Sequence, residues 1–136
     1  MKYFYCDSCF IITCYQDGKL GILSQYKNLF YISETQIVGE LFKPNELSTV
    51  VRQSVTVIST DRDEIIDKTN EFYSMYETLS LFDCLCMAYS FLDGYCLITD
   101  DKSLIKKCAI HNIQTKTSKQ ISCEFNLGGE NYDYLK

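Results

Sequence analysis

Four acidic residues stand at positions where a carboxylate needs an explanation. Asp7 and Asp101 come just after apolar, strand-like segments, and Glu40 ends a short apolar stretch. Asp83 is the only charged residue between positions 79 and 92. Clustered carboxylates repel one another unless a cation is present, and oxygen ligands favour hard ions such as Mg²⁺ or Mn²⁺. A metal ion held in this way can activate water and stabilise charge on a phosphate group.

Each of these acids also has an ordinary structural explanation. Asp7 is compatible with a turn that ends a strand, and Glu40 with an exposed helix position. Asp83 fits the first turn of a helix, where backbone N–H groups favour an anion, and Asp101 fits a helix N-cap. An unpaired carboxylate in apolar surroundings is nevertheless costly. Four acids that all reach one edge of a sheet therefore favour the metal-binding interpretation.

The cysteines offer a different chemistry. The chain has eight of them, and Cys6 and Cys9 form a CxxC pair. A structural zinc site needs a second ligand pair at similar spacing, but no second CxxC follows and His111 is the only histidine. We therefore expect buried, reduced thiols and a structural role for His111. A zinc or thiol-redox protein built on Cys6 and Cys9 is the alternative.

Composition limits the architecture and the location. With 136 residues, 46% of them hydrophobic, the chain suits one domain with one core. It has no apolar run long enough to span a membrane, and Asp7 interrupts the first apolar run too early for a signal peptide. We expect a cytoplasmic protein without a membrane span.

The charge is unevenly distributed. The net charge of −5 has the wrong sign for a protein that coats nucleic acid, yet five lysines and no acid lie between positions 102 and 119. Lys102, Lys106 and Lys107 are the candidate contacts to a nucleic-acid backbone. The alternative is a solvated helix face followed by an exposed strand edge.

Apolar runs and capping signals divide the chain into alternating strands and helices. The strands are predicted at 2–6, 28–33, 54–59, 95–99 and 113–117. The helices are predicted at 8–15, 20–26, 33–42, 45–52, 60–76, 79–92 and 101–111.

Several residues are predicted to begin or end these helices. Pairs that fit a capping box are Ser33 with Gln36, Thr60 with Asp63, and Ser80 with Asp83. Asn45 is a further candidate cap, Pro44 should stop the helix before it, and Gly94 should end the apolar helix.

This alternation predicts an α/β fold: a mainly parallel sheet of four to five strands, with helices on both faces. Ligands of such sheets lie outside the carboxyl ends of the strands. Asp7, Asp100 and Asp101 all follow predicted strands and should reach that edge.

Several segments resemble the PIN-domain family of metal-dependent nucleases. They are Cys6-Asp7-Ser8, Val38-Gly39-Glu40-Leu41, Leu79-Ser80-Leu81-Phe82-Asp83, Leu97-Ile98-Thr99-Asp100-Asp101-Lys102-Ser103-Leu104 and the helix and return strand from Lys106 to Ile113. The likeness extends over positions 2–118. Asn112 departs from it, since a glycine is usual there, and the tail from Glu124 has no counterpart.

The resemblance implies a three-layer PIN-like domain over residues 1–120, followed by a polar C-terminal extension at 121–136. By motif position, Asp7, Glu40, Asp83 and Asp101 are the implied catalytic residues and ligands of Mg²⁺ or Mn²⁺. Asp100 is a spare acid, and Thr99 supplies a hydroxyl near the metal ion.

The resemblance also implies an activity and partners. The expected function is a metal-dependent endoribonuclease, a hydrolase of RNA phosphodiester bonds, of the kind found as toxins in toxin–antitoxin pairs. An antitoxin protein and a homodimer are the partners expected on that basis. The alternative is a PIN-like module that binds protein or nucleic acid without catalysis.

Overall fold

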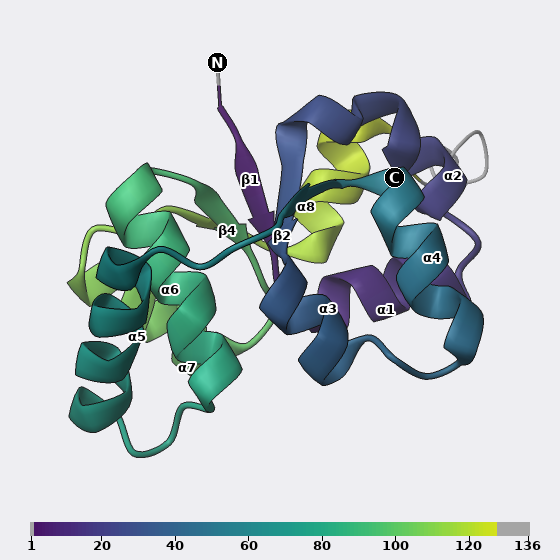
Figure 1. Ribbon diagram of the computed structural model, residues 1–136. Helices are drawn as coiled ribbons and strands as arrows, with labels where there is room; N and C mark the ends of the chain where they lie inside the picture. The colour runs from purple at the N-terminus through teal and green to yellow at the C-terminus, as the bar shows by residue number, and fades with distance from the viewer. Residues whose placement is uncertain (1, 128–136) are drawn as a thin grey trace.

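The computed structural model describes residues 2–127 and has an α/β architecture (Figure 1). Five parallel strands form one sheet in the order β3-β2-β1-β4-β5. The strands are β1 (Phe4–Cys6), β2 (Phe30–Ser33), β3 (Thr56–Ile58), β4 (Cys96–Ile98) and β5 (Thr115–Lys116). The helices are α1 (Ser8–Gln16), α2 (Leu20–Leu23), the 3₁₀ helix η1 (Ser24–Leu29), α3 (Glu34–Glu40), α4 (Asn45–Ser54), α5 (Asp63–Met75), α6 (Leu81–Asp93), α7 (Lys102–Ile110) and α8 (Ser118–Phe125).

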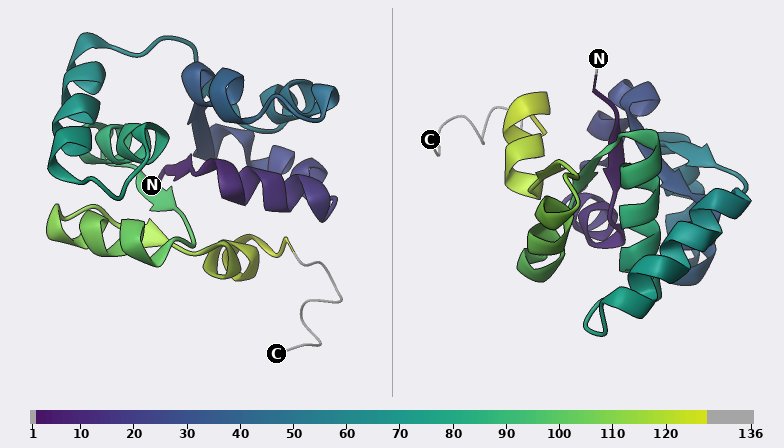
Figure 2. Two further views of the ribbon diagram at one scale, coloured as in Figure 1. Left: turned by 90° about the horizontal axis from the view of Figure 1, so that it is seen from below. Right: turned by 90° about the vertical axis from the view of Figure 1, so that its left-hand side faces the viewer.

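Alternation along the strands produces two cores, one on each face of the sheet. Phe4 and Cys6 of β1 pack with residues of α1, α2, α4 and α8, whereas Tyr5 packs with residues of α5, α6 and α7. Cys96 and Leu97 of β4 divide between the two cores in the same way. Figures 1 and 2 show α5 and α6 apart from α1 and α4, with the sheet between them. The predicted three-layer arrangement of a parallel sheet is therefore confirmed.

The strand order reverses at β1. From β1 the chain adds β2 and β3 on one side, and it then returns to add β4 and β5 on the other. The carboxyl ends of β1 and β4 thus lie side by side where the order reverses, with Cys6 opposite Ile98. This is the place where open α/β sheets hold their ligands.

The apolar helix α6 was predicted closely. Ser80 and Asp83 form a reciprocal capping box, and Gly94 ends the helix with φ of 76° in the left-handed region. Residues 84–90 are all buried. The sequence alone predicted this helix because residues next to its own ends, Ser80 with Asp83 and Gly94, determine where it begins and ends.

Other helix starts differ from the prediction. Pro44, not Asn45, is the N-cap of α4, and Arg62 caps α5 without a side-chain hydrogen bond. The predicted capping box of Thr60 and Asp63 is therefore wrong. Asp61 accepts hydrogen bonds from Thr35 (2.6 Å) and from Tyr89, so the segment between β3 and α5 is tied to other helices instead.

The expected polar extension from position 121 begins as part of the core. Ile121 and Leu127 are buried, and the ring of Phe125 contacts Phe4 and Phe30 edge-on. Helix α8, which the sequence did not predict, thus completes one face of the sheet. The rest of the expected extension, 128–136, lies outside the described residues.

Two further expectations concern cysteines and membranes. Six of the cysteines are buried, namely Cys6, Cys14, Cys84, Cys86, Cys96 and Cys108, whereas Cys9 and Cys123 are exposed. No helix within residues 2–127 is long and apolar enough to cross a membrane.

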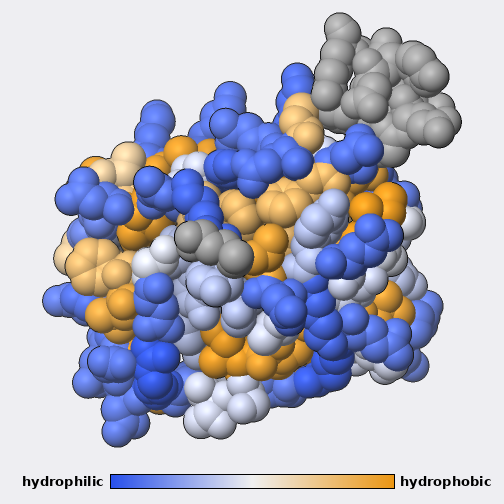
Figure 3. Space-filling view, turned by 90° about the horizontal axis from the view of Figure 1, so that it is seen from above, coloured by the Kyte–Doolittle hydropathy of each residue, from blue (hydrophilic) through white to orange (hydrophobic). Residues whose placement is uncertain are grey.

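On the face from which the amino ends of the strands are seen, apolar residues lie in small areas separated by hydrophilic ones (Figure 3).

A close contact between α3 and α6 fixes the spacing of the elements that carry Glu40 and Asp83. A Cβ atom on Gly39 would lie 2.3 Å from Cζ of Phe82. That distance is well inside van der Waals contact, so only glycine at this position lets the Phe82 ring pack directly against α3.

We expect Gly39→Ala to lower the free energy of unfolding by about 1 kcal/mol in urea denaturation. Overpacking costs roughly 1–3 kcal/mol, and the higher helix propensity of alanine offsets about 1 kcal/mol of it. Gly21→Ala is the matched control, because a Cβ on Gly21 of α2 meets no atom within 4 Å. It should leave stability unchanged or raise it. Equal effects of the two substitutions would show that Phe82 does not pack as described.

Candidate active site

Asp7 is the most buried of the four acids, with 9% of its surface exposed. It follows β1 and begins α1, but its side chain does not cap that helix. Instead, the Thr99 hydroxyl donates a hydrogen bond of 2.9 Å to Oδ2 of Asp7. The Asp7 backbone N–H also donates to the carbonyl of Ile98 at 3.1 Å. Pairing of β1 with β4 therefore positions the Asp7 carboxylate.

Glu40 is held from the other side of the same strand end. The Ser8 hydroxyl donates to Oε1 of Glu40 at 2.6 Å. Gln36 in turn donates from Nε2 to Oγ of Ser8 (2.8 Å) and to the Cys6 carbonyl (3.0 Å), and its Oε1 accepts from the Tyr5 hydroxyl at 2.9 Å. A chain of hydrogen bonds through a fully buried glutamine thus aims the last residue of α3 at the end of β1.

Sequence reasoning missed this role of Gln36. Ser33 accepts a hydrogen bond from the Gln36 backbone, as predicted, but the Gln36 side chain points into the core and does not complete the capping box. A glutamine at this position fits a cap, and nothing in the local pattern reveals a buried partner 28 residues away.

Asp83 and Asp101 are both genuine helix caps. Asp83 accepts from the Ser80 backbone N–H at 3.1 Å. Asp101 accepts from the backbone N–H groups of Ser103 (2.8 Å) and Leu104 (3.1 Å), and its own N–H donates to the Thr99 hydroxyl at 3.2 Å. The structural explanation given for each from sequence is therefore correct, and it leaves free oxygen lone pairs on both carboxylates.

The charges of these acids act on one another. Burial raises the pKa of Asp7, the Thr99 hydrogen bond lowers it, and the charge of Asp83 raises it further. Burial also raises the pKa of Glu40, against the hydrogen bond from Ser8, and the charges of Asp7 and Asp83 add to the increase. The charge of Asp83 thus disfavours the ionisation of Asp7, and the charges of Asp7 and Asp83 disfavour the ionisation of Glu40.

The charge of Asp101 acts together with those of the other three acids on Cys9, which lies in the first turn of α1. Burial raises the pKa of the Cys9 thiol first, and the charges of all four acids raise it further. This thiol therefore marks the place where the negative potentials of the quartet overlap. A raised pKa is the opposite of what a reactive thiol needs, so the redox interpretation of Cys6 and Cys9 gains no support.

The chemistry of the donors fits a hard divalent cation, but their arrangement is not a ready-made metal site. None of the ion pairs among the described residues involves the four acids, so no basic side chain there offsets the charge of buried Asp7. No three Asp, Glu, His or Cys side chains within residues 2–127 are grouped so that they could hold a metal ion. The carboxylates would therefore have to turn inward to share one.

The other predicted residues have mixed outcomes. Asp100 accepts from the Ser118 backbone (2.8 Å) and hydroxyl (2.6 Å), so it holds the start of α8 and we leave it out of the ligand set. Lys107 donates to Ser103 and lies over the ring of Tyr76. Lys102 and Lys106 are exposed on α7.

His111 has the structural role expected for it. Its Nε2 lies 2.6 Å from the Tyr76 hydroxyl, and its ring packs edge-on against Phe72.

Comparison with known proteins supports the fold. No protein-family model and no curated protein sequence matches this chain. Among solved structures, it is similar to the crystal structure of PAE2754 from Pyrobaculum aerophilum, with a TM-score of 0.65 and 12% sequence identity. The match covers 92% of this chain and 96% of that one. At this identity the similarity shows a shared α/β fold alone.

The raised pKa of Asp7 predicts a pH dependence of stability. With metal ions chelated, the folded state binds the proton of this carboxyl more tightly than the unfolded chain does. Its contribution to stability is therefore complete below the ordinary pKa of an aspartate and is lost as pH rises through the raised value. Asp7→Asn retains an oxygen for the Thr99 hydroxyl, so it should be more stable than the wild type at neutral pH.

Urea denaturation from acidic to neutral pH would measure this difference. Asp67→Asn, at an exposed position on α5, is the matched control and should follow the wild-type curve. A constant difference in unfolding free energy between Asp7→Asn and the wild type at every pH would contradict the account.

Proposed function

We propose that this protein is a metal-dependent endoribonuclease that holds Mg²⁺ or Mn²⁺ with Asp7, Glu40, Asp83 and Asp101 and hydrolyses RNA phosphodiester bonds. The proposal combines the acidic group at the carboxyl ends of β1 and β4 with the resemblance of its sequence motifs to PIN-domain nucleases. The choice of RNA rests on that resemblance.

The position of Glu40 at the end of α3 is the main support for the proposal. Asp7, Asp83 and Asp101 all lie at the starts of helices, where the helix dipole favours an anion. Glu40 is the last residue of α3, where the dipole disfavours one, and it is half-buried beside two other acids. Burial and the neighbouring charges outweigh the hydrogen bond from Ser8, since the pKa of Glu40 is raised, whereas a bound cation would favour the ionised carboxylate.

The residues around the acids have supporting roles in this mechanism. Bound at this edge, a divalent ion supplies a Lewis acid for phosphate oxygens and lowers the pKa of water. Thr99 orients Asp7 and Ser8 orients Glu40, so each carboxylate is held by a neighbouring hydroxyl. Asp101 and Asp83 are fixed by the helices they cap, and their remaining oxygen lone pairs are available to a cation.

The lysines of α7 are the proposed contacts to the RNA backbone. Lys102 directly follows Asp101, and Lys106 lies one turn further along the same exposed helix face. Their ammonium groups would attract phosphates toward an edge that is otherwise acidic. Lys107, already engaged by Ser103 and Tyr76, is the weaker candidate.

The resemblance also supports proposals about the cellular context. Toxin ribonucleases of the PIN-domain family pair with antitoxin proteins and are often dimeric. We include an antitoxin partner, a homodimer and a cytoplasmic location in the proposal on that basis.

Cleavage of single-stranded RNA in the presence of Mn²⁺ would test the nuclease function. Asp7→Asn and Asp83→Asn should each reduce the cleavage rate by at least about a hundredfold, because even residues that only support metal ligands commonly contribute 10–100-fold. Asparagine retains an oxygen for the Thr99 or Ser80 hydrogen bond, so folding should persist. Asp100→Asn is the matched control and should retain cleavage. Cleavage that is unaffected by chelation or by both substitutions would refute the proposal.

A non-catalytic binding module is the second candidate. It is favoured by one observation: among residues 2–127 the acids are not grouped as a preformed metal site. Under this alternative the wild type would bind RNA or a protein partner without any metal-dependent cleavage.

The salt dependence of RNA binding tests the role of the lysines. Substituting Lys102 and Lys106 by glutamine should reduce the slope of log affinity against log salt by about 0.7 per lysine, the value typical of single strands. Lys116→Gln is the matched control, since Lys116 is paired with Glu124. Fluorescence anisotropy in catalytically inactive Asp83→Asn would measure these slopes. Equal slopes for all variants would remove α7 from the interface.

A further inference from the structure

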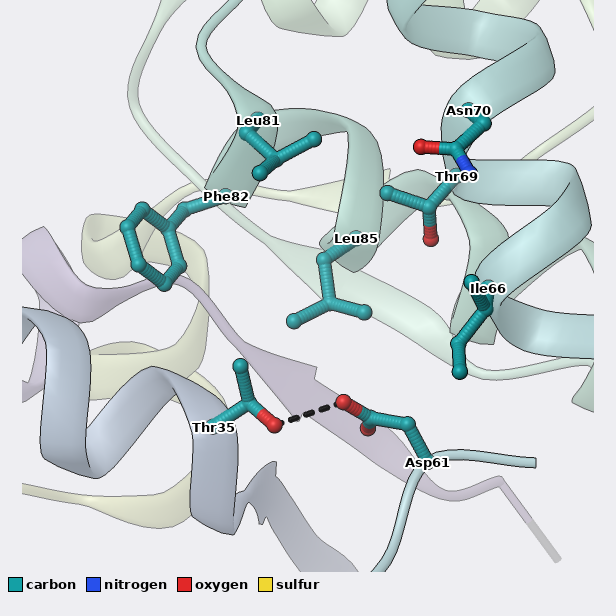
Figure 4. A pocket seen from close by; sticks show the side chains of 8 residues that line it. All are labelled: Thr35, Asp61, Ile66, Thr69, Asn70, Leu81, Phe82 and Leu85. Atoms are coloured by element: carbon teal, nitrogen blue, oxygen red, sulfur yellow. Dashed lines mark hydrogen bonds between the residues drawn. The ribbon is translucent and has the colours of Figure 1, made fainter. Parts of the chain in front are cut away.

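A hollow of about 190 Å³ opens between α3, α5 and α6 (Figure 4). Four apolar and four polar residues form its walls. The lining residues are Thr35, Asp61, Ile66, Thr69, Asn70, Leu81, Phe82 and Leu85. Figure 4 shows Thr35 and Asp61 joined by a hydrogen bond on one wall, and Thr69 and Asn70 together on another.

The hollow and the acids share two helices. Phe82 lines the hollow and directly precedes Asp83, while its ring packs against Gly39, the neighbour of Glu40. On α3, Thr35 precedes Glu40 by five residues, which corresponds to roughly 7.5 Å along a helix axis. One nucleotide can span such a separation, with its phosphate at the acids and its base in the hollow.

The size and charge of the hollow select the kind of ligand. Pockets for whole drug-sized ligands occupy roughly 300–1,000 Å³, so this one suits a single flat ring system. The carboxylate of Asp61 lies in its wall and would repel a phosphate. A neutral base, by contrast, can stack on the ring of Phe82 and cover Leu81 and Leu85.

The polar groups favour one class of base. Each oxygen of Asp61 accepts one hydrogen bond, from Tyr89 or from Thr35, and retains a further lone pair. Asn70 is exposed and has no hydrogen bond to another described residue, so its amide is available to donate and to accept. Asn and Asp are the side chains that pair with the amino groups of adenine and cytosine.

We propose that this hollow binds adenine or cytosine, the bases that carry an amino group where guanine and uracil carry a carbonyl, in the RNA whose phosphate lies at the acids; the inference rests on the proposed nuclease function. Uracil has a carbonyl where adenine and cytosine have the amino group. Its carbonyl oxygen and the carboxylate of Asp61 are both hydrogen-bond acceptors, so they repel each other. An apolar protein side chain would cover the Asn70 amide without satisfying it, which costs binding energy.

Titration of free nucleosides into the metal-free protein tests this inference. Adenosine and cytidine should shift the methyl NMR signals of Ile66, Leu81 and Leu85, and uridine should bind at least about tenfold more weakly. Asn70→Leu removes both hydrogen-bonding groups at nearly constant size and should weaken adenosine binding by about tenfold. Gln53→Leu, the same kind of exchange at an exposed position on α4, is the matched control and should bind adenosine as the wild type does.

Three results would overturn the inference. Equal binding of all three nucleosides would show an apolar hollow without base selection. No shift with any nucleoside at millimolar concentration would show that bases do not enter it. Shifts caused by N-acetyl-leucine amide but by no nucleoside would assign the hollow to a protein side chain.

Binding of a nucleoside in the hollow does not require the proposed nuclease activity. Nucleosides lack a phosphate and the titration contains no metal ion, so the acids take no part in it. Asp83→Asn should therefore bind adenosine as the wild type does, whether or not the wild type cleaves RNA. Loss of adenosine binding in Asp83→Asn would contradict a separate base site.

Discussion

The hydrogen bond between Thr99 and Asp7 joins the carboxyl ends of the two strands on which the site depends. It can form because β1 and β4 run parallel, with Cys6 opposite Ile98, so the residues that follow them emerge at the same edge. Placing β1 between β2 and β4 also brings the starts of α1 and α7 to that edge. The same pairing buries Asp7, and burial is the first cause of its raised pKa.

Structural and chemical roles coincide in the other acids. Asp83 and Asp101 stabilise the helices that they cap, yet neither cap uses all of the oxygen lone pairs of its carboxylate. Glu40 differs, since it stands at the unfavourable end of α3 and depends on the Ser8–Gln36 chain of hydrogen bonds. Helix capping thus explains the positions of Asp83 and Asp101, whereas the position of Glu40 is explained by the cation that we propose.

The sequence predicted what local rules control. The five strands, the capping box of α6 and its end at Gly94 follow from periodicity and from residues close in the chain. Helix α8 escaped prediction because its polar composition conceals the few side chains, such as Ile121 and Phe125, that pack on the sheet. Gln36 was missed for a related reason: its partners are strand residues far away in sequence.

The candidate acids were identified from sequence because each interrupts or ends an apolar segment, and the structure brings their charges together near Cys9. Their hydrogen bonds could not be predicted, since Thr99 and Asp7 are 92 residues apart. Asp100 and Asp101 are adjacent and alike in sequence, yet one holds Ser118 and the other caps α7. Only the path of the chain after β4 distinguishes them.

We propose that one divalent cation balances the charges of Asp7, Glu40, Asp83 and Asp101. Calorimetric titration of Mn²⁺ into metal-free protein, with Asp83→Asn measured beside the wild type, tests it most directly. We expect binding by the wild type, release of protons from the carboxyls of Asp7 and Glu40, whose pKa values burial has raised, and weak or no binding by the variant. Equal binding by the two proteins, or binding without proton release near the raised pKa values, would contradict it.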